Sequence, residues 1–179
     1  MLLSLFNKLN TADREVRQGK WDREGNRGVE LDGKTIGIIG YGNNGKAFAD
    51  KLKGFDVSVL AYDKYKTGFG DEWVSEVLLN ELQAQADVIS LHIPQNAETM
   101  WMLDDEFIRT CRKDFYLVNL SRGKIVVTSD LLNHLDTGKI KGACLDVLEF
   151  EKSSFEDMFA EGVEATFKEL LNSEKVILS

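Results

Sequence analysis

Three glycines between a strand-like and a helix-like segment constrain this chain more than any other feature. The sequence GIIGYGNNG contains Gly40, Gly42 and Gly45 at the spacing G-x-G-x-x-G. The segment 35–39 before them has the apolar character of a buried strand, and a helical pattern follows them directly. In this context the first glycine permits a tight turn, the second lets a phosphate approach the backbone, and the third lets the helix pack on the strand. The sequence therefore predicts a strand–turn–helix unit whose helix begins at a phosphate-binding turn.

An acidic residue follows at the distance expected for a dinucleotide-binding unit. Asp63 stands eighteen residues after Gly45, at the end of a second strand-like run over 57–62. A carboxylate there can accept hydrogen bonds from both ribose hydroxyls of NAD, and it would repel the additional phosphate of NADP. The alternative is an ordinary glycine turn with a surface aspartate. The strand, the helix and the acid together favour NAD as the cofactor.

Composition and charge limit the function classes that remain. The chain has 179 residues, of which 43% are apolar and 29% charged, as in a soluble globular domain of ordinary size. The formal net charge of -8 argues against nucleic acid or an anionic membrane as the main partner. No apolar run approaches the roughly 20 residues of a membrane span, and the apolar residues 1–6 lack the basic stretch of a signal peptide. We therefore expect a cytoplasmic protein.

Cysteine, serine and histidine positions exclude several kinds of chemistry. Cys111 and Cys144 lie in apolar stretches, which predicts buried free thiols in a reducing compartment. No cluster of His, Cys, Asp and Glu has the spacing of metal ligands. Neither Ser90 nor Ser121 has a neighbouring base or a nucleophile-elbow pattern, which argues against a hydrolase. His134 lies in a helical pattern and is expected on the helix surface.

Strand and helix patterns alternate from residue 33 onward. Continuous apolar strands such as 86–91 indicate a parallel sheet covered on both faces. The predicted architecture is a Rossmann-type, doubly wound α/β domain with three layers, over residues 28–179. The expected strands span 35–39, 56–62, 87–92, 115–119, 142–146 and 175–178, and the expected helices span 44–53, 73–84, 104–111, 128–136 and 155–171.

Residues 1–27 form a separate predicted unit. A helix is expected over 1–18, and a polar connecting segment that contains Trp21 follows it. The helix begins with apolar residues and ends with charged ones. Its apolar start needs a cover, either from another domain or from another subunit.

Polar residues gather at the carboxyl ends of the predicted strands, where ligands bind in open α/β sheets. Arg122 could clamp a substrate carboxylate and polarise a carbonyl, or it could be a surface arginine. Asp146 could accept a hydrogen bond from a nicotinamide carboxamide, or it could cap the next helix. Glu151 could orient an acid–base histidine, although the residues alone favour one more surface charge. His92 stands at a strand end before a proline, which favours an adenine pocket or a turn cap over chemistry.

Five ordered segments resemble the D-isomer-specific 2-hydroxyacid dehydrogenase family, which includes phosphoglycerate dehydrogenases. The segments read VELDGKTIGIIGYGNNG, VLAYD, ADVISLHIPQNAET, LVNLSRGKIV and GKIKGACLDVLEFE, and they run from about residue 28 to 151. The family fold is a Rossmann domain inserted into a flavodoxin-like lobe, with the active site between them. The resemblance implies an oxidoreductase that transfers a hydride between NAD and a D-2-hydroxy acid/2-keto acid pair.

The resemblance also assigns roles to individual residues. The residues implied at the pyrophosphate are Gly40, Gly42, Asn43, Asn44 and Gly45. Asp63 is implied at the adenine ribose, and the residues implied around the adenine are His92, Ile93, Pro94 and Thr99. Those on the nicotinamide side are Asn119, Ser121 and Asp146. Arg122 matches the family's substrate-binding arginine, and Glu151 matches the glutamate that orients its catalytic histidine.

Several departures from the family bear on activity. Asn44 stands where the family has an apolar residue, so the phosphate turn could pack differently. The family's catalytic histidine follows the last strand, whereas no histidine occurs here after His134. The N-terminal substrate lobe is also missing, so we expect an excised cofactor-binding domain that binds NAD without turnover. The helix at 1–18 matches one that commonly packs in the family's dimer, so we expect a homodimer through it.

Two other functions stay open on the sequence. An NAD-responsive, corepressor-like interaction module would use the cofactor to shift an oligomer equilibrium instead of donating a hydride. The Arg122–Glu151 pair favours the enzyme over that module. A different Rossmann enzyme, such as an adenosylhomocysteinase-type cofactor domain, is disfavoured by the LSRG and LDVLEFE segments.

Overall fold

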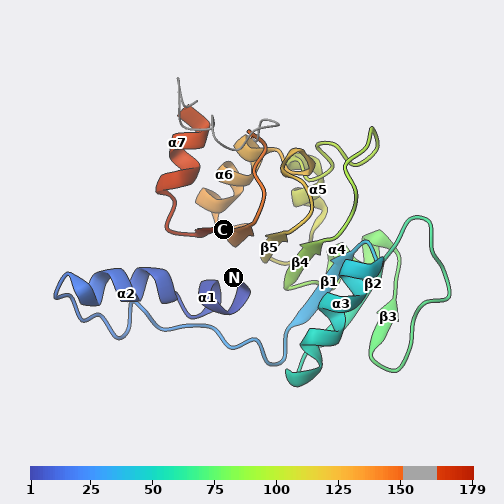
Figure 1. The fold of residues 1–179 in the computed structure, drawn as a ribbon, viewed down its shortest axis with the longest axis horizontal. Coiled ribbons are helices and arrows are strands. Elements are labelled where there is room, and N and C mark those ends of the chain that lie inside the picture. The colour runs from blue at the N-terminus through green and yellow to red at the C-terminus, as the bar shows by residue number, and fades with distance from the viewer. Residues whose placement is uncertain (151–164) are drawn as a thin grey trace.

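The computed structural model describes residues 1–150 and 165–179, and these form one seven-stranded sheet (Figure 1). Every pair of neighbouring strands is parallel, in the order β3-β2-β1-β4-β5-β6-β7. The strand order reverses between β1 and β4, which is the kind of switch point where such sheets bind ligands. The strands are β1 (Thr35–Ile39), β2 (Ser58–Tyr62), β3 (Val74–Glu76), β4 (Val88–Leu91), β5 (Phe115–Asn119), β6 (Ile140–Leu145) and β7 (Val176–Leu178). The predicted Rossmann-type architecture is confirmed.

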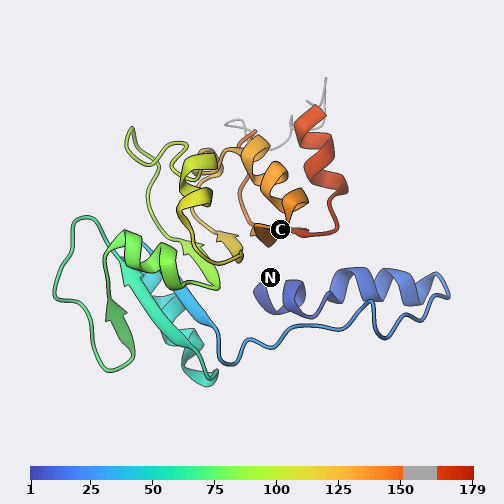
Figure 2. The same cartoon turned by 180° about the vertical axis from the view of Figure 1, so that it is seen from behind.

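Helices cover both faces of the sheet (Figures 1 and 2). One face carries α4 (Leu79–Gln85), α5 (Asp105–Thr110), α6 (Thr128–Thr137) and α7 (Ala165–Asn172), whose apolar side chains share one core cluster. The other face carries α1 (Leu2–Phe6) and α3 (Asn43–Lys51), whose side chains share a second cluster. Short 3₁₀ turns follow α3 at Leu52–Gly54 and β5 at Gly123–Ile125. No helix in the described part of the chain is long and apolar enough to cross a membrane.

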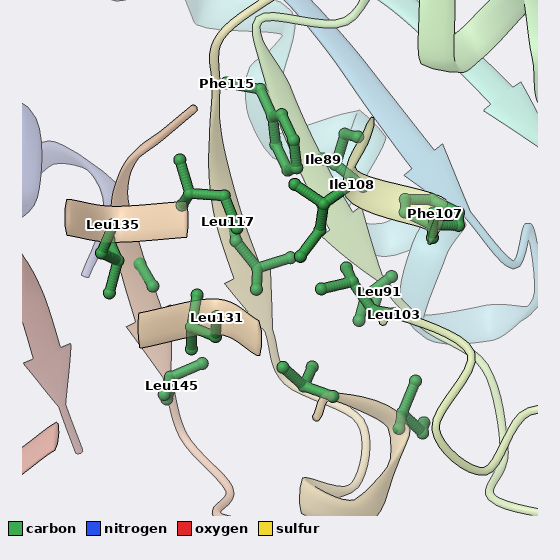
Figure 3. Close-up of a cluster of buried hydrophobic side chains, with 14 of the residues drawn as sticks. Ile89, Leu91, Leu103, Phe107, Ile108, Phe115, Leu117, Leu131, Leu135 and Leu145 are labelled. Carbon is green, nitrogen blue, oxygen red and sulfur yellow. The ribbon is translucent and has the colours of Figure 1, made fainter. Parts of the chain in front are cut away.

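The larger core cluster lies between the central strands and the helices α4 to α7. Figure 3 shows the part of it that packs between the central strands and the helices α5 and α6. Ile89 of β4 and Leu117 of β5 are fully buried there, and Ile108 of α5 and Leu131 of α6 pack against the same cluster. Val88 and Val118 of the same two strands face the second cluster. Strands buried on both faces explain the continuous apolar runs in the sequence. This burial fixes the strand ends on which the site is built.

The N-terminal segment differs from the single helix predicted over residues 1–18. It forms α1 and then α2 (Leu9–Arg17), because Lys8 adopts a left-handed backbone with φ 48°. Phe6 is buried and packs on Tyr116 with ring centroids 4.5 Å apart, so the chain's own sheet covers the apolar start. Helix α2 has no buried residue and extends away from the sheet (Figures 1 and 2).

The predicted helix over 73–84 is wrong in its first half. Residues 74–76 form the edge strand β3, which pairs with β2, and α4 begins only at Leu79. Apolar residues at 73, 74, 77, 78 and 82 have helical spacing, which hid the strand. The Asp71 carboxylate accepts hydrogen bonds from the N–H groups of Trp73 and Val74 and turns the chain toward β2, so strand pairing prevails over the local pattern.

Other element bounds differ by a few residues. The strand predicted over 142–146 begins at Ile140 and ends at Leu145, and the strand predicted over 56–62 begins at Ser58. Of the helix predicted over 155–171, residues 165–172 form α7, and its earlier part lies outside the described residues.

Candidate functional site

The three glycines of the motif occupy three different environments after β1. Gly40 has φ +94°, and a Cβ atom on it would lie 2.6 Å from the carbonyl oxygen of His92. A Cβ atom on Gly45 would lie 2.1 Å from the carbonyl oxygen of Gly40, so α3 packs directly on the turn. A Cβ atom on Gly42, the N-cap of α3, would meet nothing within 4 Å. Gly40 therefore forms the tight turn, Gly42 leaves space for a phosphate, and Gly45 allows the helix to pack closely on the turn.

Helix α3 presents its N-terminus beside this open space. Its N-cap residue, Gly42, has no side chain to accept from the first N–H groups, which leaves them available to an anion. Asn43 and Asn44 form the first two positions of the helix, and both are exposed. Asn44 therefore does not enter the core, and the contact between Gly45 and Gly40 forms despite the departure from the family pattern.

A pocket of about 350 Å³ opens next to the glycine turn. It joins the carboxyl ends of β1, β2 and β4, at the place where the strand order reverses. The predicted residues that line it are Gly40, Gly42, Asp63, His92, Ile93, Pro94 and Thr99. The other lining residues are Ile39, Tyr62, Lys64, Tyr65, Leu79, Asn96, Glu98 and Met102.

Asp63 ties the end of β2 to the glycine turn. Its Oδ2 accepts a hydrogen bond of 2.9 Å from the backbone N–H of Tyr41. Its Oδ1 accepts from the N–H groups of Tyr65 and Lys66, at 2.9 and 3.1 Å. A carboxylate offers about four acceptor positions, so capacity for a further donor such as a ribose hydroxyl is left. This role in organising the turn was not visible in the sequence.

His92 belongs to the wall of the pocket. Its Nε2 lies 2.9 Å from the Oγ of Ser90, a fully buried residue of β4, and its ring packs near Phe48 of α3. Burial lowers the pKa of His92 to about 4. The imidazole is therefore neutral near pH 7, which suits a pocket wall better than acid–base chemistry.

Four of the predicted residues meet at the ends of β5 and β6. The Ser121 hydroxyl donates to the carbonyl oxygen of Leu91 at 2.7 Å and accepts from Ile93 N–H at 3.1 Å, which joins the β4 and β5 ends. Asn119 is buried, and its amide accepts from Ser121 N–H and donates to the carbonyl oxygen of Arg122.

The two charged members of this group face outward. Arg122 is exposed, and its Nη1 donates to the carbonyl oxygen of Ser121 at 2.7 Å. Asp146 is also exposed, and its N–H donates to the carbonyl oxygen of Asn119 at 3.1 Å. A guanidinium held at a strand end can bind a carboxylate through two parallel hydrogen bonds. Glu151 lies outside the described residues.

Glu149 holds the start of α6, a role that was not predicted from the sequence. Its Oε2 accepts a hydrogen bond of 2.8 Å from Thr128 N–H at the start of α6, and its Oε1 accepts from the Trp101 indole at 3.2 Å. A Cβ atom on Gly123 would lie 1.8 Å from the carbonyl oxygen of Leu148, so this segment packs on the turn that carries Arg122. The only sequence signal was one acid among several in LDVLEFE.

Replacing Glu149 by alanine is expected to lower the free energy of unfolding by about 1–2 kcal/mol, because the start of α6 loses its only side-chain acceptor among the described residues. Urea denaturation of the chain measures this change. Glu169→Ala, on the exposed side of α7, is the matched control and should stay within about 0.5 kcal/mol of the parent chain. Equal stability of the two variants would contradict the anchoring role.

The remaining titratable candidates, Cys111, Cys144 and His134, do not line the pocket. Burial raises the pKa of Cys111 to about 12 and that of Cys144 to about 11, and both are buried free thiols as predicted. The surface position predicted for His134 is wrong: only 12% of its side chain is exposed, and its Nε2 lies 2.8 Å from Asp105 Oδ1, between α6 and α5. Within the described residues, no group of three or more His, Cys, Asp and Glu could hold a metal ion.

Comparisons with known proteins agree with this geometry. Residues 1–179 match the family model described as "D-isomer specific 2-hydroxyacid dehydrogenase, NAD binding domain". A glyoxylate reductase from Thermofilum pendens is 36% identical over 84% of this chain and 47% of its own length. A D-3-phosphoglycerate dehydrogenase from Archaeoglobus fulgidus is 35% identical over 86% of this chain and 30% of its own length.

A solved structure of a D-lactate dehydrogenase from Aquifex aeolicus, complexed with NAD and lactic acid, superposes with a TM-score of 0.85. It is 30% identical, and the match covers 99% of this chain and 55% of that one. The chain thus spans about half of the glyoxylate reductase and of this solved structure.

Proposed function

Because this chain belongs to the D-isomer-specific 2-hydroxyacid dehydrogenase family and is its NAD-binding domain, we propose that it serves hydride transfer between NAD and a D-2-hydroxy acid/2-keto acid pair. The observation that carries the proposal is that the candidate residues share one rim of the sheet, which is the edge formed by the carboxyl ends of its strands. The glycine turn, the pocket beside Asp63 and the Arg122 guanidinium all lie at the carboxyl ends of the strands. Cofactor and substrate groups would therefore meet on one side of the domain.

The residues of the rim fit the parts of NAD. The open space at Gly42 and the free N–H groups of α3, where Asn43 and Asn44 stand, suit the pyrophosphate. Asp63 would accept from the adenine ribose. The pocket walls that would hold the adenine are His92, Ile93, Pro94 and Thr99. The residues proposed on the nicotinamide side are Asn119, Ser121 and Asp146.

NAD, when bound, accepts or donates the hydride, and the protein supplies position and charge. Arg122 would bind the carboxylate of the substrate and polarise its carbonyl group. Reduction of a keto acid also requires a proton donor. His92 is neutral in the pocket wall and His134 lies between α5 and α6, so we expect this chain alone to bind NAD without turnover. Glu151 would orient the histidine supplied by a further part of the enzyme.

Calorimetric titration of this chain with NADH, and with NADPH in parallel, tests the cofactor part of the proposal. We expect saturable binding of NADH and at least about tenfold weaker binding of NADPH, because Asp63 would repel the additional phosphate. Absence of NADH binding would contradict the proposed site. Equal binding of the two cofactors would contradict the role given to Asp63.

The names of the relatives suggest the first substrates to try. Glyoxylate, pyruvate and 3-phosphohydroxypyruvate are the small keto acids that correspond to a glyoxylate reductase, a D-lactate dehydrogenase and a D-3-phosphoglycerate dehydrogenase. They should be tried with NADH on a protein that joins this domain to the family's substrate lobe. The acidic net charge of -8 argues against a nucleic-acid or anionic-membrane partner. We also propose a cytoplasmic location, which the buried free thiols of Cys111 and Cys144 support because thiols stay reduced there.

We further propose a homodimer through residues 1–18. Helix α2 has no buried residue in this chain, although Leu9 and Val16 on it are apolar and more than 40% exposed. Trp21, which follows α2, is 81% exposed. Apolar side chains gathered on one projecting segment are typical of a surface that another subunit covers.

A further inference from the structure

An ionic bridge crosses one side of the proposed cofactor pocket. The Glu98 carboxylate, in the loop between β4 and α5, accepts from the Lys64 ammonium at 2.7 Å. The Tyr65 hydroxyl donates to the same carboxylate oxygen at 2.6 Å. Lys64 and Tyr65 directly follow Asp63 at the end of β2, and all four residues line the pocket.

Two lysines follow the acid that is proposed to select the cofactor. Lys64 and Lys66 flank Tyr65 immediately after Asp63, and the Lys66 Nζ lies 3.4 Å from the carbonyl oxygen of Tyr41 in the glycine turn. An ammonium group beside the ribose is what a 2′-phosphate would attract. The positive charge of Lys64 would therefore attract the same phosphate that Asp63 repels. This charge needs an acidic partner if the site is to reject NADP.

Glu98 supplies that partner. The hydrogen bond with Lys64 is the main reason why the pKa of the Glu98 carboxyl group is lowered, and the same contact raises the pKa of the Lys64 ammonium group. Both groups are therefore charged near neutral pH, and the pair carries no net charge at the pocket. The bridge is exposed, with about half of each side chain accessible. An exposed pair of this kind stabilises the fold little, so its effect on a charged ligand can be measured without unfolding the protein.

We propose that Glu98 is a second acid, beside Asp63, that sets the preference of this site for NAD over NADP. It occupies the Lys64 ammonium through a direct hydrogen bond, so that this ammonium is not available to a 2′-phosphate in the same pocket. The inference rests on the proposed cofactor site, because it assigns a specificity-determining residue to that site.

Glu98→Gln tests the proposal, because it removes the charge and keeps the shape of the side chain. Titration of this chain should show NADPH binding about five- to tenfold tighter than in the parent, whereas NADH binding should change less than about twofold. The double variant Lys64→Gln/Glu98→Gln should lose that gain, since the freed ammonium causes it. The gain should also shrink at high salt. Glu169→Gln, an equal change of charge on exposed α7, should leave both affinities unchanged.

The possible outcomes separate this inference from the proposed function. If the parent chain does not bind NADH, the proposed site itself fails. If the parent binds NADH selectively and Glu98→Gln retains the same NADPH affinity, only the role of Glu98 fails. An equal gain or an equal loss for both cofactors would also overturn it, because a general change in charge or packing would then explain the result. Thermal melting of each variant confirms that the domains compared are folded.

Discussion

A Gly45→Ala substitution is expected to abolish measurable NADH binding and to lower the free energy of unfolding by about 1–3 kcal/mol. The new Cβ atom would lie 2.1 Å from the carbonyl oxygen of Gly40, and that atom belongs to the backbone of the turn. Gly40 cannot yield easily, because it has φ +94° and itself lies against the His92 backbone. The start of α3 must therefore move away from the turn. Calorimetry and urea denaturation measure the two effects.

Two other glycines separate binding from stability. Gly42→Ala should leave the stability nearly unchanged, because its Cβ atom would enter open space, but it should also prevent NADH binding, because a phosphate must occupy that space. Gly54→Ala, with nothing within 4 Å of its Cβ atom, should affect neither property. Tight NADH binding by either Gly45→Ala or Gly42→Ala would place the pyrophosphate elsewhere.

The elements predicted correctly are those with strong local signals. The strand over 35–39 and the strand over 115–119 have the bounds expected from their apolar runs, because each is buried on both faces and tolerates few polar residues. The turn after the first strand follows from glycines whose roles are steric and therefore local. The grouping of Asp63 and His92 in one pocket follows from parallel strands, which bring their carboxyl ends to one edge.

The features that escaped prediction depend on contacts between distant segments. The hydrogen bond from Tyr41 N–H to Asp63 requires the folded glycine turn, and the Glu149 carboxylate accepts from residues 21 and 48 positions away in sequence. Strand β3 exists because β2 offers an edge to pair with, which no three-residue pattern can reveal. Lys8 adopts a left-handed backbone after α1, and the break between α1 and α2 was not predicted because a glycine usually marks such a helix end in the sequence.

In a protein that joins this domain to the family's substrate lobe, Arg122→Ala is expected to lower kcat/KM for a 2-keto acid by about a thousandfold or more. A loss of that size corresponds to about 4 kcal/mol of transition-state stabilisation, which is reasonable for a bidentate, charge-assisted contact with a carboxylate. Arg122→Lys should restore only part of the activity, because an ammonium keeps the charge and loses the paired geometry. Steady-state kinetics with NADH and the keto acid measure both variants.

The NADH affinity and the stability of Arg122→Ala should remain those of the parent domain. The Arg122 side chain is exposed, and its backbone is held separately by the Asn119 amide and by the packing of Gly123 on Leu148. Arg112→Ala, at an exposed arginine before β5, is the matched control and should keep full activity. Unchanged turnover in Arg122→Ala would remove the main argument for placing the substrate at this strand end. It would also remove the argument against an NAD-responsive interaction module, which does not need an arginine that binds a substrate. A selective loss of turnover, with NADH binding intact, would assign Arg122 to the substrate, next to the residues proposed for the nicotinamide side of the cofactor at the same strand ends.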